Sequence, residues 1–361
     1  MFYRVWQPYL FLRKLFKDEF AVVWYEPDHF RMHPWEWHIY EDEKYQLIYR
    51  QLDAACRWAD VVVWMGLHTD KALGLFMHMQ AKHGKRFVSE FDDYIYSIPV
   101  SNSAYRVYKP GTDFTRIAIQ QMKASSALIV STPHLKKLYA AYNPNVHIVE
   151  NTIDTALWRN PNKHAGDKVV IGWVGGGTHN EDHVMIQKAV FEVLGKCQKA
   201  YFHYLSGCPM PKGYAHARIK WEEDFKSIDK YPKWVSRKGF DIGIAPLVDN
   251  EFNRGKSNLR WLEYSAMGIP TVAAPLIHFK QSIKHGKTGF LAGTHDQWVH
   301  YLTRLVSEPA LRENIGGAAR REVKKSWNPE IQARKYRDAL EVIANAEPNA
   351  SHVDDACRPA Y

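Results

Sequence analysis

The segment KVVIGWVGGGTH, residues 168–179, places an apolar run directly before three consecutive glycines. The run predicts a buried strand over 168–174, and the apolar spacing of 182–198 predicts an amphipathic helix after the turn. This order is the repeating unit of a doubly wound α/β domain. Glycines let backbone N–H groups approach a phosphate, and the helix N-terminus adds positive potential. The candidate phosphate contacts, which a plain strand–helix connection would equally explain, are Gly175, Gly176, Gly177 and Thr178.

Short apolar runs alternate with amphipathic stretches along the chain, as in parallel sheets covered by helices. In the first half we expect strands over 20–25, 60–65, 86–90, 127–131 and 146–150, and helices over 43–58, 71–83, 114–125 and 133–141. In the second half we expect further strands over 201–206, 217–221, 240–246 and 271–274, and helices over 225–236 and 257–267. The fold class is therefore α/β, with two Rossmann-like doubly wound domains.

The polar segment 151–167 contains Asn-Pro-Asn at 160–162 and is the natural linker between the two domains. We expect an N-terminal domain over 1–155, a C-terminal domain over 156–328, and a last helix with a frayed tail over 329–361. Two such sheets would face each other across a cleft with their strand carboxyl ends, where open α/β sheets bind ligands.

The composition points to globular domains. The chain has 361 residues, of which 46% are hydrophobic and 24% are charged, and this excludes disorder as the main state. No run approaches the roughly 18 apolar residues of a membrane helix, and residues 1–8 do not resemble a signal peptide. The four cysteines are scattered without a CxxC pair, so neither zinc nor disulfides are expected to organise the fold. We therefore expect a cytoplasmic protein without stable membrane insertion.

The net charge of +9 suggests an anionic partner, and its distribution is uneven. Residues 1–155 hold 18 basic and 17 acidic side chains, which leaves 30 basic and 22 acidic side chains in the remainder. The stretch 312–337 alone holds eight basic residues against three glutamates. This stretch is the predicted footprint for a polyanion such as DNA: Arg312, Arg320, Arg321, Lys324, Lys325, Arg334, Lys335 and Arg337.

A second informative segment is NRGKSNLRWLEYSAMGIP, residues 253–270, which follows another expected strand. Ser257 is a good N-cap and Gly268 a good C-terminal stop, so these two residues predict the bounds of the helix over 257–267.

The charges around this helix suggest a nucleotide site. Arg254 and Lys256 would stand at its N-terminus, where cations oppose the helix macrodipole unless an anion such as a diphosphate lies between them. Glu263 would lie two turns after Lys256 on the same face and could accept hydrogen bonds from ribose hydroxyls. Arg260, by contrast, fits a solvated charged face.

Four segments together resemble family-4-type retaining glycosyltransferases of the GT-B fold: the run 241–274, the turn 172–177, NTID at 151–154, and SWNP at 326–329 with its closing helix. The resemblance covers roughly residues 145–345, and the chain also looks similar to phage-type enzymes that modify DNA. It implies transfer of a sugar from a nucleotide diphosphate sugar, expected to be UDP-linked, to a hydroxyl with retention. It also implies that no bound metal or other cofactor is essential.

The resemblance assigns roles to residues of the second half. It implies that Glu263 holds the donor ribose and that Arg254 and Lys256 neutralise the diphosphate, with Ser257 beside them. It also suggests a nucleobase contact at 221–225, foremost Trp221, and a last helix that crosses back to the first domain.

The first half offers the candidate catalytic residues. Asp92 and Asp93 follow the strand expected at 86–90 and could position an acceptor hydroxyl, remove its proton or bind a metal. A capped, hydrogen-bonded turn explains them equally well. His68 also follows a strand, and the resemblance suggests that it contacts the donor sugar.

Two interpretations of the acceptor and one without catalysis stay open. The leading one is a 5-hydroxymethylpyrimidine in double-stranded DNA, bound by the basic stretch, although the near-neutral first half argues against it. The second is a glycan or a small hydroxylated molecule. The third is a GT-B binding or virion protein without catalysis, because the family's first glutamate would fall on Gly255.

Overall fold

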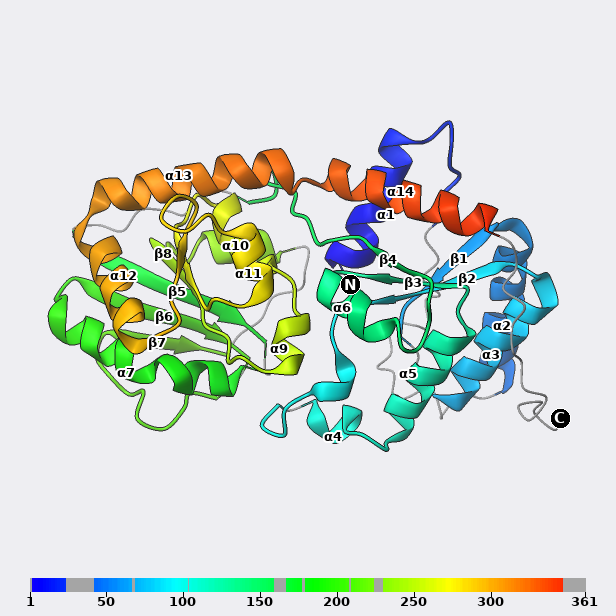
Figure 1. The fold of residues 1–361 in the computed structure, drawn as a ribbon, viewed down its shortest axis with the longest axis horizontal. Coiled ribbons are helices and arrows are strands. Elements are labelled where there is room, and N and C mark those ends of the chain that lie inside the picture. Colours follow the sequence, from blue (N-terminus) through cyan, green and yellow to red (C-terminus); the bar gives the residue numbers. More distant parts are fainter. Residues whose placement is uncertain are drawn as a thin grey trace. The chain divides into compact units, whose positions relative to one another are not determined.

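The computed structural model describes residues 2–23, 42–66, 69–102, 104–158, 167–176, 179–207, 209–223 and 230–346. The chain divides into two compact units (Figure 1). Unit 1 consists of residues 1–7, 98–106 and 151–332, and unit 2 of residues 8–97, 107–150 and 333–361. The chain thus passes between the units at 7/8, 97/98, 106/107, 150/151 and 332/333, and its first seven residues belong with most of its second half.

Unit 1 is built on a six-stranded parallel sheet of order β10-β9-β8-β5-β6-β7. Its strands are β5 (Val169–Gly175), β6 (Ala200–Ser206), β7 (Ile219–Glu222), β8 (Ile242–Ala245), β9 (Thr271–Ala273) and β10 (Phe290–Leu291). All seven residues of β5 are buried, as the continuous apolar run requires of a strand covered on both faces. The helices are α7 (Asn180–Lys196), α8 (Tyr231–Ser236), α9 (Glu251–Gly255), α10 (Leu259–Ala266), α11 (Ile277–Ser282), α12 (His295–Ser307) and α13 (Pro309–Ser326).

Unit 2 contains a four-stranded parallel sheet of order β1-β2-β3-β4. Its strands are β1 (Val61–Trp64), β2 (Arg86–Phe91), β3 (Ala127–Val130) and β4 (Val146–Ile148). The helices are α1 (Gln7–Leu15), α2 (Asp42–Trp58), α3 (Asp70–His83), α4 (Tyr105–Tyr108, from residue 107 onward), α5 (Asp113–Ala124), α6 (Pro133–Tyr139) and, from residue 333 onward, α14 (Pro329–Asn345). Tyr336 and Ile343 of α14 share a buried cluster with Leu12, Phe16 and Val88.

The α/β prediction with two parallel sheets is confirmed, and most expected elements form within a few residues of their expected bounds. The strand expected at 20–25 is an exception, because the described residues Phe20–Val23 form no strand. Phe20 and Val22 are instead half-buried against the cluster that contains Phe16. Their alternating apolar pattern therefore reflects packing without a neighbouring strand.

Two further observations concern membrane-spanning helices and cysteines. In the part of the chain that the structure describes, none of the helices is both long and apolar enough to cross a membrane. Cys56 and Cys197 are buried thiols outside any disulfide.

Candidate functional site

Helix α10 is fixed against the strand that leads into the Gly-rich turn. The Tyr264 hydroxyl donates to the Gly172 carbonyl at 3.2 Å and accepts from the Val174 amide at 3.2 Å. Its ring occupies space that only a glycine at 243 leaves open, because a Cβ there would stand 2.4 Å from the ring. The two segments that the sequence singled out therefore meet at the carboxyl end of β5.

Arg260 lies inside this site, so its assignment to a solvated face is wrong. Its Nη1 is 3.1 Å from Glu263 Oε2 and 3.5 Å from the Tyr231 hydroxyl, and its guanidinium lies 5.6 Å from the Trp173 ring centroid. Only 21% of the side chain is exposed. Burial disfavours its charge, but the nearby Glu263 carboxylate outweighs this and raises the pKa of Arg260. One feature of the sequence indicated this pairing: Arg260 and Glu263 are three residues apart, so in a helix their side chains are neighbours.

Glu263 is a buried carboxylate, 5% exposed, whose two oxygens accept hydrogen bonds from Tyr3, Tyr231 and Arg260. The Tyr3 hydroxyl donates to its Oε1 at 3.3 Å, and the Tyr231 hydroxyl donates to its Oε2 at 3.3 Å. Burial raises the pKa of Glu263, while the charge of Arg260 and the two hydroxyl donors oppose this rise. The network holds the carboxylate in a single orientation.

A second polar group lies where α7 begins. His179 Nδ1 is 2.7 Å from Asp182 Oδ2, and Asp182 Oδ1 accepts from the Val248 amide at 2.7 Å. Burial raises the pKa of Asp182 to about 6. Burial, followed by the charges of Lys256 and Arg260, holds the pKa of His179 well below its usual value. The N-terminus of α7 thus carries a buried histidine–aspartate pair, and the positive potential of a helix N-terminus makes it a candidate position for an anion.

The expected start of α10 is wrong. The helix begins at Leu259 with Asn258 as its N-cap residue, and Lys256 terminates the preceding helix α9. Lys256 and Glu263 therefore do not lie on one face of one helix. The cause is tertiary: Ser257 Oγ accepts from Asn151 Nδ2 at 2.8 Å, and Asn258 Nδ2 donates to Ser282 Oγ at 2.8 Å.

The two predicted basic donor residues are placed differently. Arg254 is exposed and pairs with Asp249 at 2.7 Å and with Glu251 at 3.7 Å. The Lys256 ammonium lies 4.9 Å from the Phe252 ring centroid, and its charge reaches both His179 and Asp182. Lys256 is therefore the better placed of the two for an anion at α7.

In the described part of the Gly-rich turn, Gly175 still belongs to the sheet, whereas Gly176 is exposed. Gly175 ends β5, where its carbonyl accepts from the Gly207 amide at 3.0 Å. Gly176 is exposed, and among the described residues other than its chain neighbours no atom comes within 4 Å of where its Cβ would stand. Gly177 and Thr178 lie outside the described residues.

Trp221 of β7 belongs to an aromatic cluster beside the site. Its ring stacks on Tyr204 with centroids 4.8 Å apart and meets the edge of His183 at 5.0 Å. His183 also packs against Trp173 at 4.2 Å, and burial lowers its pKa to about 3. The cluster thus joins Trp221 to the strand β5 that carries the turn.

In unit 2, Asp92 and Asp93 are exposed directly after β2. Their backbone carbonyls accept from the hydroxyls of Ser131 at 3.2 Å and Tyr139 at 2.5 Å. These bonds fix the turn that the sequence allowed for and leave the two carboxylate groups at the carboxyl edge of the sheet. His68 lies outside the described residues.

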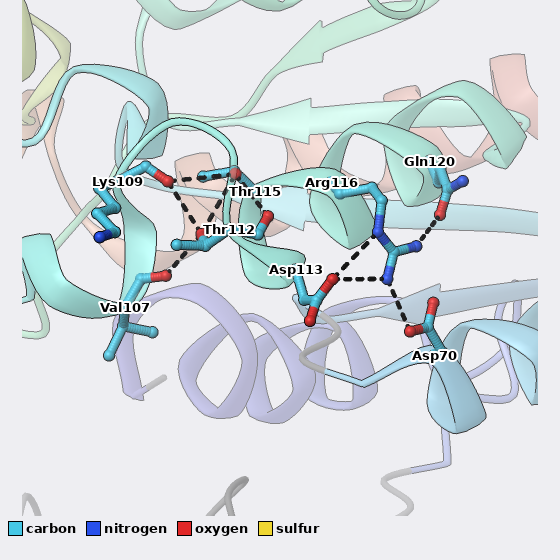
Figure 2. Close-up of polar contacts among 8 residues, drawn as sticks. All are labelled: Asp70, Val107, Lys109, Thr112, Asp113, Thr115, Arg116 and Gln120. Atoms are coloured by element: carbon cyan, nitrogen blue, oxygen red, sulfur yellow. Dashed lines mark hydrogen bonds and ion pairs between the residues drawn. The ribbon is translucent and has the colours of Figure 1, made fainter.

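Sequence reasoning missed a polar cluster at the starts of α3 and α5 (Figure 2). Arg116 donates to three side chains: to Asp70 at 2.7 Å, to Asp113 at 3.1 and 3.3 Å, and to Gln120 at 3.1 Å. Both helices follow strands of the same sheet, so the cluster lies on the side of its carboxyl edge. Within the described ranges, no group of three or more His, Cys, Asp or Glu side chains could hold a metal ion.

The basic stretch is not one continuous footprint. Arg312 donates to the carbonyls of Leu305 at 2.6 Å and Val306 at 3.1 Å, and so caps α12. Lys335 pairs with Glu150 at 2.6 Å, and Arg337 pairs with Asp338 at 2.7 Å. The predicted nucleic-acid residues Arg320, Arg321, Lys324 and Lys325 all lie on α13, where Arg320 is half-buried and the other three are exposed.

Comparison with known proteins finds a matching family model, a curated relative and several similar solved structures. Residues 185–338 match the model of a family described as glycosyl transferase-like. D-inositol 3-phosphate glycosyltransferase from Thermobispora bispora is 29% identical over 113 residues, which are 30% of this chain and 25% of the relative. The match therefore spans about a quarter of that relative's length.

Solved structures share the fold over most of the chain. The TarM structure has a TM-score of 0.62 at 13% identity and covers 83% of this chain and 58% of its own. HepE from Anabaena, solved with UDP-glucose, has a TM-score of 0.56 at 13% identity and covers 82% and 83%. A mutant of S. aureus TarM, solved with fondaparinux, α-GlcNAc-glycerol and UDP, has a TM-score of 0.57 at 12% identity and covers 76% and 59%. The chain therefore has the GT-B fold, and its glycosyl transferase-like match contains the Arg260–Glu263 pair of α10.

Proposed function

We propose that this protein is a retaining glycosyltransferase that binds a nucleotide diphosphate sugar, UDP-linked, in unit 1. The observation that carries the proposal is the contact of α10 with the strand before the Gly-rich turn: Tyr264 binds both Gly172 and Val174, and Arg260 lies beside Trp173. HepE, which shares the fold, was solved with UDP-glucose, and this supports a UDP-linked donor.

The site residues then have distinct roles. The backbone of Gly175 and Gly176 and the cations Lys256 and Arg260 bind the diphosphate, with Gly177 and Thr178 as predicted further contacts. These cations and N–H dipoles stabilise the negative charge that develops as the sugar leaves. Glu263 fixes the ribose through its remaining acceptor capacity, since a carboxylate has about four lone-pair sites.

The remaining donor residues play supporting parts in this proposal. Trp221 borders the nucleobase, and Ser257 lines the diphosphate loop. Arg254 neutralises charge at the rim, where it already pairs with Asp249.

In the reaction, the bond between the anomeric carbon and the diphosphate oxygen breaks, and a bond to the acceptor oxygen forms. Asp92 and Asp93, as candidates for removing the acceptor proton, and His68, as a candidate contact of the donor sugar, stay predictions from the sequence. The diphosphate carries away the electron pair of the broken bond. None of these steps requires a metal ion, so we expect turnover to persist in EDTA.

We propose a glycan or small hydroxylated molecule as acceptor. The TarM mutant was solved with α-GlcNAc-glycerol, and the curated relative is named for an inositol phosphate. The DNA reading rests on the exposed cations of α13, since Arg312, Lys335 and Arg337 have intramolecular partners. The reading as a non-catalytic protein rests on Gly255, which lies in the short helix α9.

The decisive experiment is incubation of the purified protein with a panel of nucleotide sugars and hydroxylated acceptors, followed by mass spectrometry. We expect one acceptor to gain the mass of a hexose or related sugar, with release of UDP. Modification of hydroxymethylated DNA alone would instead favour the DNA reading. Absence of transfer and of donor hydrolysis across the whole panel would contradict the enzyme proposal and favour the binding protein.

A further inference from the structure

Residues 2–7 are built into unit 1. They form a π-helical turn, Phe2–Trp6, that runs into α1, and Tyr3, Arg4 and Gln7 are 8%, 1% and 2% exposed. Gln7 Nε2 donates to Thr152 Oγ1 at 3.0 Å and to Gln332 Oε1 at 2.9 Å. Gln332 Nε2 in turn donates to the Tyr3 carbonyl at 3.0 Å. Buried polar bonds of this kind hold a segment in one position.

This segment places the hydroxyl of Tyr3 within hydrogen-bond distance of Glu263, which lies 260 residues later in the sequence. Tyr231 and Arg260 bind Oε2, while Tyr3 is the partner shown for Oε1. The hydroxyl of Tyr3 therefore fixes the rotation of the carboxylate about its last bond and holds Oε1 in place.

The same segment also supports the loop before α10. Arg4 Nη1 donates to Asn151 Oδ1 at 3.2 Å, and Asn151 Nδ2 donates to Ser257 Oγ at 2.8 Å. Two proposed donor-binding residues, Glu263 and Ser257, are thus connected to residues 2–7 through side-chain hydrogen bonds.

We propose that Tyr3 is a positioning residue of the donor site: its hydroxyl orients Glu263 for the ribose of the nucleotide. This inference rests on the proposed function. Tyr3 acts through Glu263, and its ring meanwhile packs in the hydrophobic core of unit 1. Removal of the hydroxyl should therefore weaken nucleotide binding without unfolding the unit.

The test compares Tyr3→Phe with wild type by calorimetric binding of UDP and by donor kinetics. We expect the Kd for UDP to rise about 5- to 20-fold and the donor KM to rise with it, whereas the acceptor KM stays unchanged. A matched control is Tyr336→Phe, which removes a buried tyrosine–glutamate hydrogen bond to Glu90 in unit 2. The control should leave the Kd for UDP within about twofold of wild type.

A double-mutant cycle with Glu263→Gln separates positioning from a general loss of packing. If Tyr3 acts through Glu263, Tyr3→Phe should weaken UDP binding much less in the Glu263→Gln background than in wild type. The two variants that carry Tyr3→Phe share the same packing change, so the cycle stays interpretable even if the substitution lowers the Tm.

The possible results are distinguishable. If wild type binds UDP and Tyr3→Phe binds it equally well, or if the two substitutions act independently, the role of Tyr3 is overturned and the proposed function stands. If wild type binds none of UDP, GDP and ADP, the proposed function fails, and the role of Tyr3 fails with it.

Discussion

Arg260 Nη1 lies 3.1 Å from Glu263 Oε2, one helical turn away on α10, and this pair is the electrostatic centre of the site. Glu263 is buried, and the guanidinium supplies the positive charge that keeps an anion tolerable there. The planar group also faces the Trp173 ring of β5. The pair therefore links the strand before the Gly-rich turn to the proposed ribose contact.

Replacement of Arg260 tests this pair. Arg260→Met should destabilise the protein by about 1–3 kcal/mol at pH 7, because it leaves the Glu263 carboxylate buried without its cation. This expected loss of stability is smaller than that for a fully buried ion pair, since 21% of the arginine side chain is exposed. Arg260→Lys should retain most of the stability but weaken UDP binding about tenfold, because an ammonium lacks the planar fork.

Urea unfolding and calorimetry with UDP measure the two effects. The control is the double variant Arg260→Met with Glu263→Gln, which removes both charges and should recover most of the lost stability. An Arg260→Met protein as stable as wild type would show that the ion pair does not compensate a buried charge.

The sequence predicted the elements whose signals are local. The apolar run predicts β5 correctly, since burial on both faces of a parallel strand needs no distant partner to be recognised. The phosphate site at the turn that follows stays a prediction. The N-terminus of α10 could not be predicted in this way. Ser257 is a good cap by type, but its hydroxyl is taken by Asn151, and the helix starts after Asn258 instead.

The sequence did not indicate the contacts of Tyr3 and Arg260 with Glu263, and the physical reason is the same for both. Tyr3 reaches Glu263 only because residues 2–7 fold into unit 1, and no periodicity near residue 3 indicates that contact. Arg260 reads as a surface charge by type, and its burial depends on Trp173 and Tyr231 from other elements.

Substitution of two neighbouring glycines of α13 by alanine should change the free energy of unfolding in opposite directions. A Cβ on Gly316 would stand 2.0 Å from the carbonyl oxygen of Gly268, so Gly316→Ala must displace backbone near the end of α10. We expect a loss of about 1–3 kcal/mol. Gly317→Ala is the matched control, because its Cβ would meet only the end of the Arg321 side chain at 3.5 Å. It should stabilise the helix by up to about 1 kcal/mol.

Denaturant unfolding of both variants measures this difference. Gly316→Ala should also weaken UDP binding, since the backbone it displaces follows directly on the helix that carries Glu263. Equal stability of the two alanine variants would mean that the close approach of α13 to Gly268 is not a constraint in solution.

Buried His183 predicts a loss of stability in acid. Burial lowers its pKa to about 3, below the usual value of 6.5, so the folded state binds fewer protons than the unfolded state between these values. The free energy of unfolding should therefore fall as the pH drops below about 6.5, by about 1.4 kcal/mol per pH unit. His183→Phe keeps an aromatic ring beside Trp173 and Trp221 and should remove this dependence.

The measurement is urea unfolding of wild type and His183→Phe at pH values from 4 to 7. Asp182 has a raised pKa and contributes the opposite trend, with stability lost as the pH rises from about 4 to 6. Because the charges of His183, His179 and Asp182 influence one another, the difference between the two curves reports His183 together with this coupling. Parallel curves would show that the imidazole is solvated or protonated in the folded protein.

The exposed cations of α13 separate the two acceptor classes. The triple variant Arg321→Gln, Lys324→Gln, Lys325→Gln should leave UDP binding and transfer to a small acceptor unchanged, because these residues are not part of the proposed donor site. We expect wild type to bind hydroxymethylated duplex DNA weakly, with an affinity that changes little between about 50 and 200 mM salt. If DNA is instead the acceptor, the logarithm of the affinity should fall steeply with the logarithm of the salt concentration, and the triple variant should reduce that slope by about 2.7.

A matched control variant changes the exposed residues Lys188, Lys233 and Arg237 to Gln, which removes the same charge from other elements of unit 1. A steep salt dependence that only the α13 variant reduces would therefore overturn the choice of a glycan or small-molecule acceptor.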